Sequence, residues 1–143
     1  MSKYVYRTAS VCAGNEGRIG LSSVAGIVTG PMLRRVVADS SAWGSGAKLA
    51  GLIDIRAAVL GVRPDDLLRA AVESGRSGLD VQPTAFVCAP DQIRLLRDYA
   101  ELAGALGALK GVFSCPAAAR AWTDRQAQVR AHRLERRARL AGP

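Results

Sequence analysis

Leu-Ala-Gly-Leu-Ile-Asp-Ile-Arg, residues 49–56, is the stretch on which the predicted fold depends. A short apolar run of this kind is typical of a strand buried on both faces, because a half-exposed strand alternates polar and apolar side chains. Pro64 then suits the first turn of a helix, where its missing N–H costs nothing. Asp65 and Asp66 favour the positive end of the same helix dipole. We therefore expect a central strand, a loop and a helix.

The rest of the chain has similar units on both sides of this strand. Residues 3–11 and 18–28 are rich in β-branched and aromatic residues and flank a glycine-containing turn, which predicts an antiparallel hairpin. The expected helices span residues 31–42, 64–74, 91–106 and a last segment from Pro116, and the further strands span 84–89 and 110–115. This order predicts a small single-domain α/β sandwich. Its sheet is mostly parallel and five-stranded, with an antiparallel edge hairpin and about four helices.

The composition indicates one independently folding domain, since 143 residues at 49% hydrophobic are enough for a core of their own. No run approaches the roughly 18–20 apolar residues that cross a bilayer, and the first ten residues lack the apolar core of a signal peptide. We expect a cytoplasmic protein without a membrane span. The three cysteines, Cys12, Cys88 and Cys115, are odd in number and lack metal-ligand spacing, so buried thiols are expected rather than disulfides or a metal site.

The net charge of +8 is concentrated near the C-terminus. Residues 120–143 hold seven of the 20 Lys and Arg residues but only two of the 12 acidic ones. We therefore expect an α/β domain over residues 1–125 and a basic helical extension or tail over 126–143. Such a tail is more often a solvated helix face than a recognition surface. Nucleic-acid binding is disfavoured because aromatic residues, which form stacking platforms, make up only 5% of the chain.

Four stretches together resemble the STAS-like domains, named for sulphate transporters and anti-sigma factor antagonists. They are residues 24–31, Gly-Leu-Ile-Asp-Ile-Arg at 51–56, Ala-Phe-Val-Cys-Ala-Pro at 85–90, and Val-Phe at 112–113 followed by Ala-Arg-Ala-Trp at 119–122. The resemblance covers about residues 17–125 and points to the bacterial group related to the sporulation anti-anti-sigma protein. It implies a non-enzymatic regulatory or protein-interaction module with a protein partner or a second copy of itself.

The chain departs from this family at its best-known switch. Members of the family are phosphorylated by a partner kinase on a Ser or Thr at the start of the helix that follows the central strand. That position corresponds to about residues 62–64, and no Ser or Thr occurs between Arg56 and Glu73. The resemblance therefore implies a module that lacks the phosphorylatable residue. Asp65 and Asp66 give the same helix start a permanent negative charge.

An enzymatic role is not expected, because the only histidine, His132, lies in the Arg-rich tail and leaves nucleophilic catalysis without a base. No cofactor is expected either. The alternative function is a carrier or sensor of a small apolar or anionic ligand, bound at the carboxyl edge of the sheet where ligands of open α/β sheets gather.

Five charged residues are expected near that edge and form the candidate ligand or partner site: Arg56, Arg63, Asp65, Asp66 and Asp91. Arg56 leaves the central strand beside the helix starts, where a guanidinium and backbone N–H groups can hold an anion. In the alternative, Arg56 pairs with Asp91 or Asp66 and only fixes a loop. The acidic residues likewise have a structural explanation, since carboxylates stabilise helix starts.

Overall fold

The computed structural model describes residues 2–39, 48–76 and 82–142 as one mixed α/β domain. In chain order its elements are β1 (Ser2–Tyr6), β2 (Ala9–Glu16), β3 (Ile19–Thr29), α1 (Gly30–Asp39), β4 (Ala50–Gly61), α2 (Pro64–Arg76), β5 (Thr84–Val87), α3 (Ile93–Ala105), β6 (Lys110–Phe113) and α4 (Pro116–Leu140). The strands form one sheet in the order β1-β2-β3-β4-β5-β6. β1, β2 and β3 pair antiparallel, and β3 to β6 pair parallel. The predicted class is confirmed, and β4 lies in the interior of the sheet as expected.

The described sheet has six strands rather than five, because the first arm of the predicted hairpin is itself a hairpin. β1 and β2 pair from Tyr6 and Ala9 outward around a turn at Arg7 and Thr8. The sequence gives no glycine or proline at this turn, and Arg7 adopts a positive φ of 40°. Thr8 Oγ1 donates to the carbonyl of Ile27 at 2.8 Å, which fixes the turn against β3.

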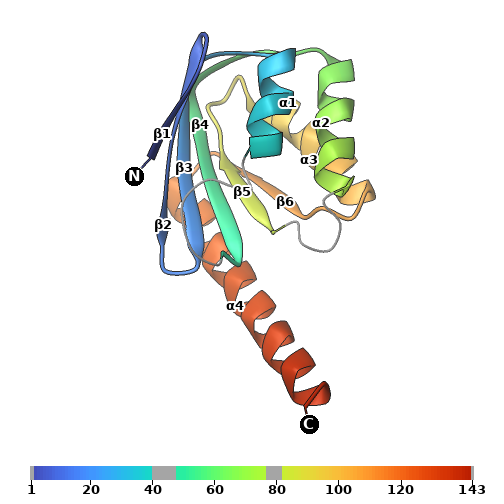
Figure 1. The fold of residues 1–143 in the computed structure, drawn as a ribbon. Coiled ribbons are helices and arrows are strands. Elements are labelled where there is room, and N and C mark those ends of the chain that lie inside the picture. Colours follow the sequence, from blue (N-terminus) through green and yellow to red (C-terminus); the bar gives the residue numbers. More distant parts are fainter. Residues whose placement is uncertain (1, 40–47, 77–81, 143) are drawn as a thin grey trace.

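The connecting helices lie on one face of the sheet because each parallel strand is added at the same edge. Right-handed crossovers then carry every connection over the same side. Helices α1, α2 and α3 cover this face, as Figure 1 shows, and enclose the main apolar core. Helix α4 packs on the opposite face, where Ala119 and Trp122 contact Ala85 and Val87 of β5.

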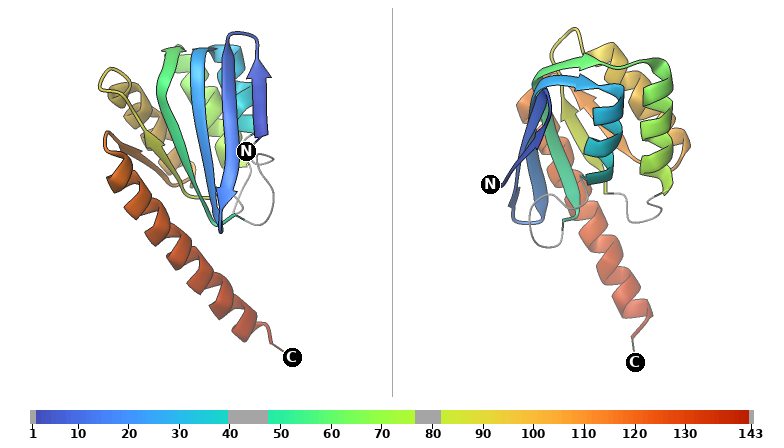
Figure 2. Two further views of the ribbon diagram at one scale, coloured as in Figure 1. Left: turned by 90° about the vertical axis from the view of Figure 1, so that its left-hand side faces the viewer. Right: turned by 45° about the horizontal axis from the view of Figure 1, so that its top comes forward.

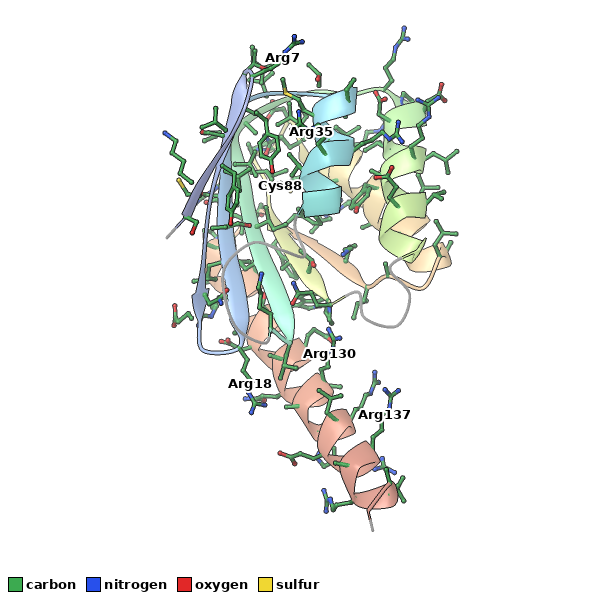
Figure 3. The ribbon with its side chains drawn as sticks, in the orientation of Figure 1. Arg7, Arg18, Arg35, Cys88, Arg130 and Arg137 are labelled. Carbon is green, nitrogen blue, oxygen red and sulfur yellow. The ribbon has the colours of Figure 1, made fainter. Side chains whose placement is uncertain are left out.

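Helix α4 covers only part of its face. It contacts β4, β5 and β6 and, less extensively, β3, then projects beyond the sheet and leaves β1 and much of β2 and β3 uncovered (Figure 2). Arg120 ties its first turns to β2 through an ion pair of 2.9 Å with Glu16. Arg130 Nη1 reaches the carbonyl of Leu49 at 3.5 Å, and Arg137 lies further along the projecting part (Figure 3). The predicted division at residues 125 and 126 falls inside this helix and stays a prediction.

Strand β4 continues to Gly61, five residues beyond its predicted end, by passing through a β-bulge. Ser23 pairs with Asp54, but Ala25 pairs with Ala57, so β4 contains one residue more than β3 over this interval. Bulges leave backbone groups without ladder partners. One of them, the N–H of Arg56, donates to Asp54 Oδ1 at 3.0 Å.

The side chain of Gln92, the residue before α3, forms hydrogen bonds with backbone groups of the bulge from the helix-covered face of the sheet. Its Nε2 donates to the carbonyls of Ile55 and Ala58 at 2.8 and 2.6 Å. Its Oε1 accepts from the N–H of Ala89 at 2.9 Å. Gln92 is only 4% exposed, so water cannot replace these bonds. One buried carboxamide therefore joins the irregular part of β4 to the turn that begins α3.

We expect Gln92→Ala to lower the free energy of unfolding by about 2–4 kcal/mol, because three buried backbone groups would lose their partners. Urea denaturation followed by circular dichroism measures this change. Gln128→Ala, which shortens an exposed glutamine on α4, is the matched control and should cost less than about 0.5 kcal/mol. A loss below about 1 kcal/mol for Gln92→Ala would contradict the assigned role.

Candidate functional site

Arg56 is bound to its neighbour on β4 rather than to a distant carboxylate. Its Nη2 and Nε lie 2.7 and 3.0 Å from the two carboxylate oxygens of Asp54. Hydrogen bonding from Arg56 lowers the pKa of Asp54, although partial burial opposes this shift. From the sequence, Arg56 was considered as an ion-pair partner of Asp91 or Asp66. In the structure it pairs instead with Asp54, two residues earlier. An anion at this position would have to compete with a bidentate carboxylate.

The start of α2 brings together two of the other predicted residues. Asp66 Oδ2 accepts a hydrogen bond of 2.9 Å from the N–H of Arg63, in the manner of a helix capping box. The same carboxylate packs against Gly30 at the start of α1, where an added Cβ would overlap it. Asp65 is exposed on the first turn of α2, and Asp91 is exposed in the turn before α3. Asp66 therefore has a local structural role, whereas Asp65 faces solvent.

A cavity of about 100 Å³ lies between the sheet and the helices α1, α2 and α3. Its walls are almost entirely apolar and include Val28, Ile53, Leu67, Phe86, Leu96 and Tyr99. The rings of Phe86 and Tyr99 meet edge to face with their centroids 5.9 Å apart. None of the five charged residues predicted for the site is among the described residues that line the cavity. The cavity was not predicted from the sequence, because apolar wall residues have the same pattern as core residues.

Two polar residues of the cavity are at the amino edge of the sheet. Thr84 and Lys110, the first residues of β5 and β6, both line it. Lys110 Nζ donates to Thr84 Oγ1 at 3.3 Å, and Thr84 Oγ1 donates to the carbonyl of Gln82 at 3.1 Å. Burial lowers the pKa of Lys110 to about 8. The sequence gives one sign of this polar pair, because Lys110 begins the apolar run Lys-Gly-Val-Phe. Most lysines are instead solvated.

The cysteines only partly follow the expectation of buried thiols. Cys88 is 1% exposed and lies between the sheet and the helices (Figure 3). Burial raises the pKa of its thiol to about 11, which makes it a poor nucleophile. Cys12 is half-buried and Cys115 is exposed, so the expectation was wrong for Cys115. Cys115 is the N-cap residue of α4, in the short connection between β6 and that helix.

In the described part of the chain, the His, Cys, Asp and Glu side chains form no group of three or more that could hold a metal ion. None of its helices combines the length and the apolar character needed to cross a membrane.

Two solved structures resemble this one. An anti-sigma factor antagonist from Mycobacterium paratuberculosis matches with a TM-score of 0.53 and 15% sequence identity, over 82% of this chain and 95% of that one. An uncharacterised protein from Shewanella loihica PV-4 with a SpoIIAA-like fold matches with a TM-score of 0.50 and 14% identity, over 86% of this chain and 98% of that one. No protein-family model matches the chain, and no curated protein matches it significantly. At such low identities the likeness shows the fold.

Lys110 gives the protein a characteristic dependence of stability on pH. The unfolded chain keeps the proton of this lysine up to about pH 10.5, whereas the folded chain releases it above about pH 8. Because the unfolded state then binds more protons, the free energy of unfolding should rise between these values, by about 2–3 kcal/mol at most. Urea denaturation at pH 7, 8, 9 and 10 measures the rise.

Lys110→Met is the comparison protein for this measurement, since it keeps the length of the side chain and removes the titration. Cys88 acts in the opposite direction between about pH 9 and 11 in both proteins, so only the difference between them reports on Lys110. The variant should be the more stable of the two at pH 7, and the gap should narrow toward pH 10. A gap that does not change with pH would show that Lys110 is solvated in the folded state.

Proposed function

We propose that this chain, which has the STAS-like fold expected from its sequence, is a non-enzymatic regulatory or protein-interaction module that acts without a phosphorylation switch. The proposal is supported by its likeness to a structure named as an anti-sigma factor antagonist. In this proposal the protein acts in the bacterial cytoplasm. Its partner is another protein or a second copy of itself.

The observation that carries the proposal is the fixed charge at the start of α2. STAS-like switch proteins present a phosphorylatable Ser or Thr at this place, whereas here Arg63, Pro64 and Asp65 are exposed in succession. Asp66 is held by the backbone of Arg63 and does not turn outward. A partner that docks at this helix start therefore meets one electrostatic state, determined by Arg63 and Asp65. Binding is then controlled by the amount of each protein rather than by phosphate.

The uncovered face of the sheet supports a role in binding proteins. The register of β3 and β4 places Ile27 beside Val59, and these side chains are 50% and 63% exposed. Val5 on β1 belongs to the same face through the pairing of successive strands, and it is 71% exposed. Apolar residues gathered on one open face are typical of surfaces that contact another protein.

The position of the only histidine supports a non-enzymatic role. His132 is exposed on the part of α4 that projects beyond the sheet, and it is not among the described residues lining the cavity. Catalysis by a Ser/His/Asp or Cys/His arrangement needs the base within hydrogen-bond reach of the nucleophile. The exposed end of a helix does not provide that geometry.

A second candidate function, a carrier or sensor of a small ligand, is favoured by the cavity under α1, α2 and α3. Apolar walls with a few convergent polar groups are typical of small-molecule sites. The sequence placed this ligand at the carboxyl edge of the sheet, but two polar residues of the cavity, Thr84 and Lys110, are at the amino edge. For this second candidate function, we therefore place the ligand in the cavity.

Asp65→Lys should weaken docking at the start of α2, because it reverses an exposed charge and leaves the Asp66 cap in place. We expect recovery of the specific partner to fall about fivefold or more in a quantitative pull-down from the source cell, as loss of about 1 kcal/mol of interface energy requires. Glu101→Lys, the same reversal on an exposed site of α3, is the matched control. Melting curves verify that both variants are folded.

Two results would contradict the proposal. The first is phosphate found by peptide mapping on any residue from Arg56 to Glu73, which would restore a switch at this helix start. The second is a partner whose recovery changes equally in Asp65→Lys and Glu101→Lys, which would show that docking depends only on total charge.

A further inference from the structure

The cavity under α1, α2 and α3 has different chemistry at its two ends. Toward the carboxyl edge its walls are formed by apolar side chains such as Val28, Leu60 and Leu67. At the amino edge Lys110 and Thr84 line it instead. An apolar cavity with a charged group at one end is complementary to a short hydrocarbon that carries a charged head group.

The ammonium of Lys110 determines the sign of that head. It can donate three hydrogen bonds, and the described residues supply one acceptor, Thr84 Oγ1 at 3.3 Å. The ion pairs of the described residues join Arg34 to Glu73, Arg56 to Asp54, and Arg120 to Glu16 and Asp124, so none of them includes Lys110. Lys110 is half-buried. A cation taken partly out of water without an anion is costly, and a carboxylate beside it reduces that cost. Burial has lowered the pKa of Lys110 to about 8, which leaves it mostly protonated at neutral pH.

The volume of the cavity limits the length of the hydrocarbon. An engineered cavity of about 150 Å³ holds one benzene molecule, which has six carbon atoms, so on the same scale the observed cavity of about 100 Å³ suits an apolar tail of about four carbon atoms. The edge-to-face pair of Phe86 and Tyr99 gives the wall a rigid aromatic surface. A nucleotide or a long acyl chain does not fit without displacement of the helices.

We infer that this cavity binds a short aliphatic carboxylate, with its head group on Lys110 Nζ and Thr84 Oγ1 and its chain along the apolar wall that includes Ile53 and Phe86. The inference rests on the second candidate function, the ligand carrier or sensor, and names its ligand class. It places recognition of the head group at the amino edge of the sheet, away from the fixed charges at the start of α2.

The inference is tested by NMR titration of the full chain with pentanoate and with pentanamide, its neutral counterpart of the same size. Pentanoate should shift the amide signals of Thr84, Phe86 and Lys110 and bind at least about tenfold more tightly than pentanamide, as a charge-assisted hydrogen bond requires. In Lys110→Met the two probes should bind equally. Lys3→Met removes the same charge from the exposed strand β1 and should leave both affinities unchanged.

A second variant makes the test independent of any folding defect in Lys110→Met. Leu95 lines the cavity from α3, and Leu95→Phe should fill part of it, keep a cooperative melting curve and lose both probes. Equal affinity of the wild type for pentanoate and pentanamide would overturn recognition of the carboxylate while leaving an apolar ligand carrier standing. If neither probe shifts any signal of the wild type, both the inference and the carrier function are wrong.

Discussion

The carboxamide of Gln92 joins the β4 bulge to the turn before α3, beyond the point where the pairing of β4 with β5 ends. It satisfies the carbonyls of Ile55 and Ala58 on either side of the β4 bulge and the N–H of Ala89 in the next loop. Backbone groups buried without partners cost free energy comparable to the bonds they lack, so the three hydrogen bonds of Gln92 stabilise the bulge. The starts of α2 and α3 follow directly from the path of β4 through this bulge and from the turn at Ala89. The exposed charges of Arg63 and Asp65 are therefore positioned by a neutral side chain from a different loop.

The regular part of the fold could be predicted because local patterns and tertiary structure agree there. Apolar runs at Leu52 and Phe86 became parallel strands, and Pro64 and Pro116 begin helices as their missing N–H groups predict. The remainder depends on contacts between residues far apart in the chain. The turn at Arg7 carries no glycine and is fixed by Thr8 bonding to Ile27, nineteen residues away. Gln92 bonds to residues 37 and 34 positions earlier, a relation that no local pattern contains.

The candidate site was predicted from its charged residues, and these residues have different structural roles. Asp54 and Arg56 hold the bulge together, since the carboxylate accepts both the guanidinium and the backbone N–H of Arg56. Asp66 caps α2, so Arg63 and Asp65 are the exposed remainder at that helix start. The cavity escaped prediction because Thr84 and Lys110 meet only after two parallel strands pair, twenty-six residues apart. The exposed charges of Arg63 and Asp65 therefore follow the carboxyl end of β4, whereas Thr84 and Lys110 of the cavity are at the amino ends of β5 and β6.

The placement of α4 on its own face of the sheet affects how the chain acquires its structure during synthesis. The core beneath α1, α2 and α3 is built from residues up to Val112 and β6 is complete at Phe113, whereas the cluster of Ala85, Val87 and Ala119 needs α4. Domains form as their segments leave the ribosome, N-terminal parts first. The helix-covered side can therefore pack while α4 is still inside the ribosome, and the other side of β5 and β6 stays open to water until α4 has emerged. A chaperone that follows this nascent chain would find its apolar target there, on the half of the sheet that is closed last.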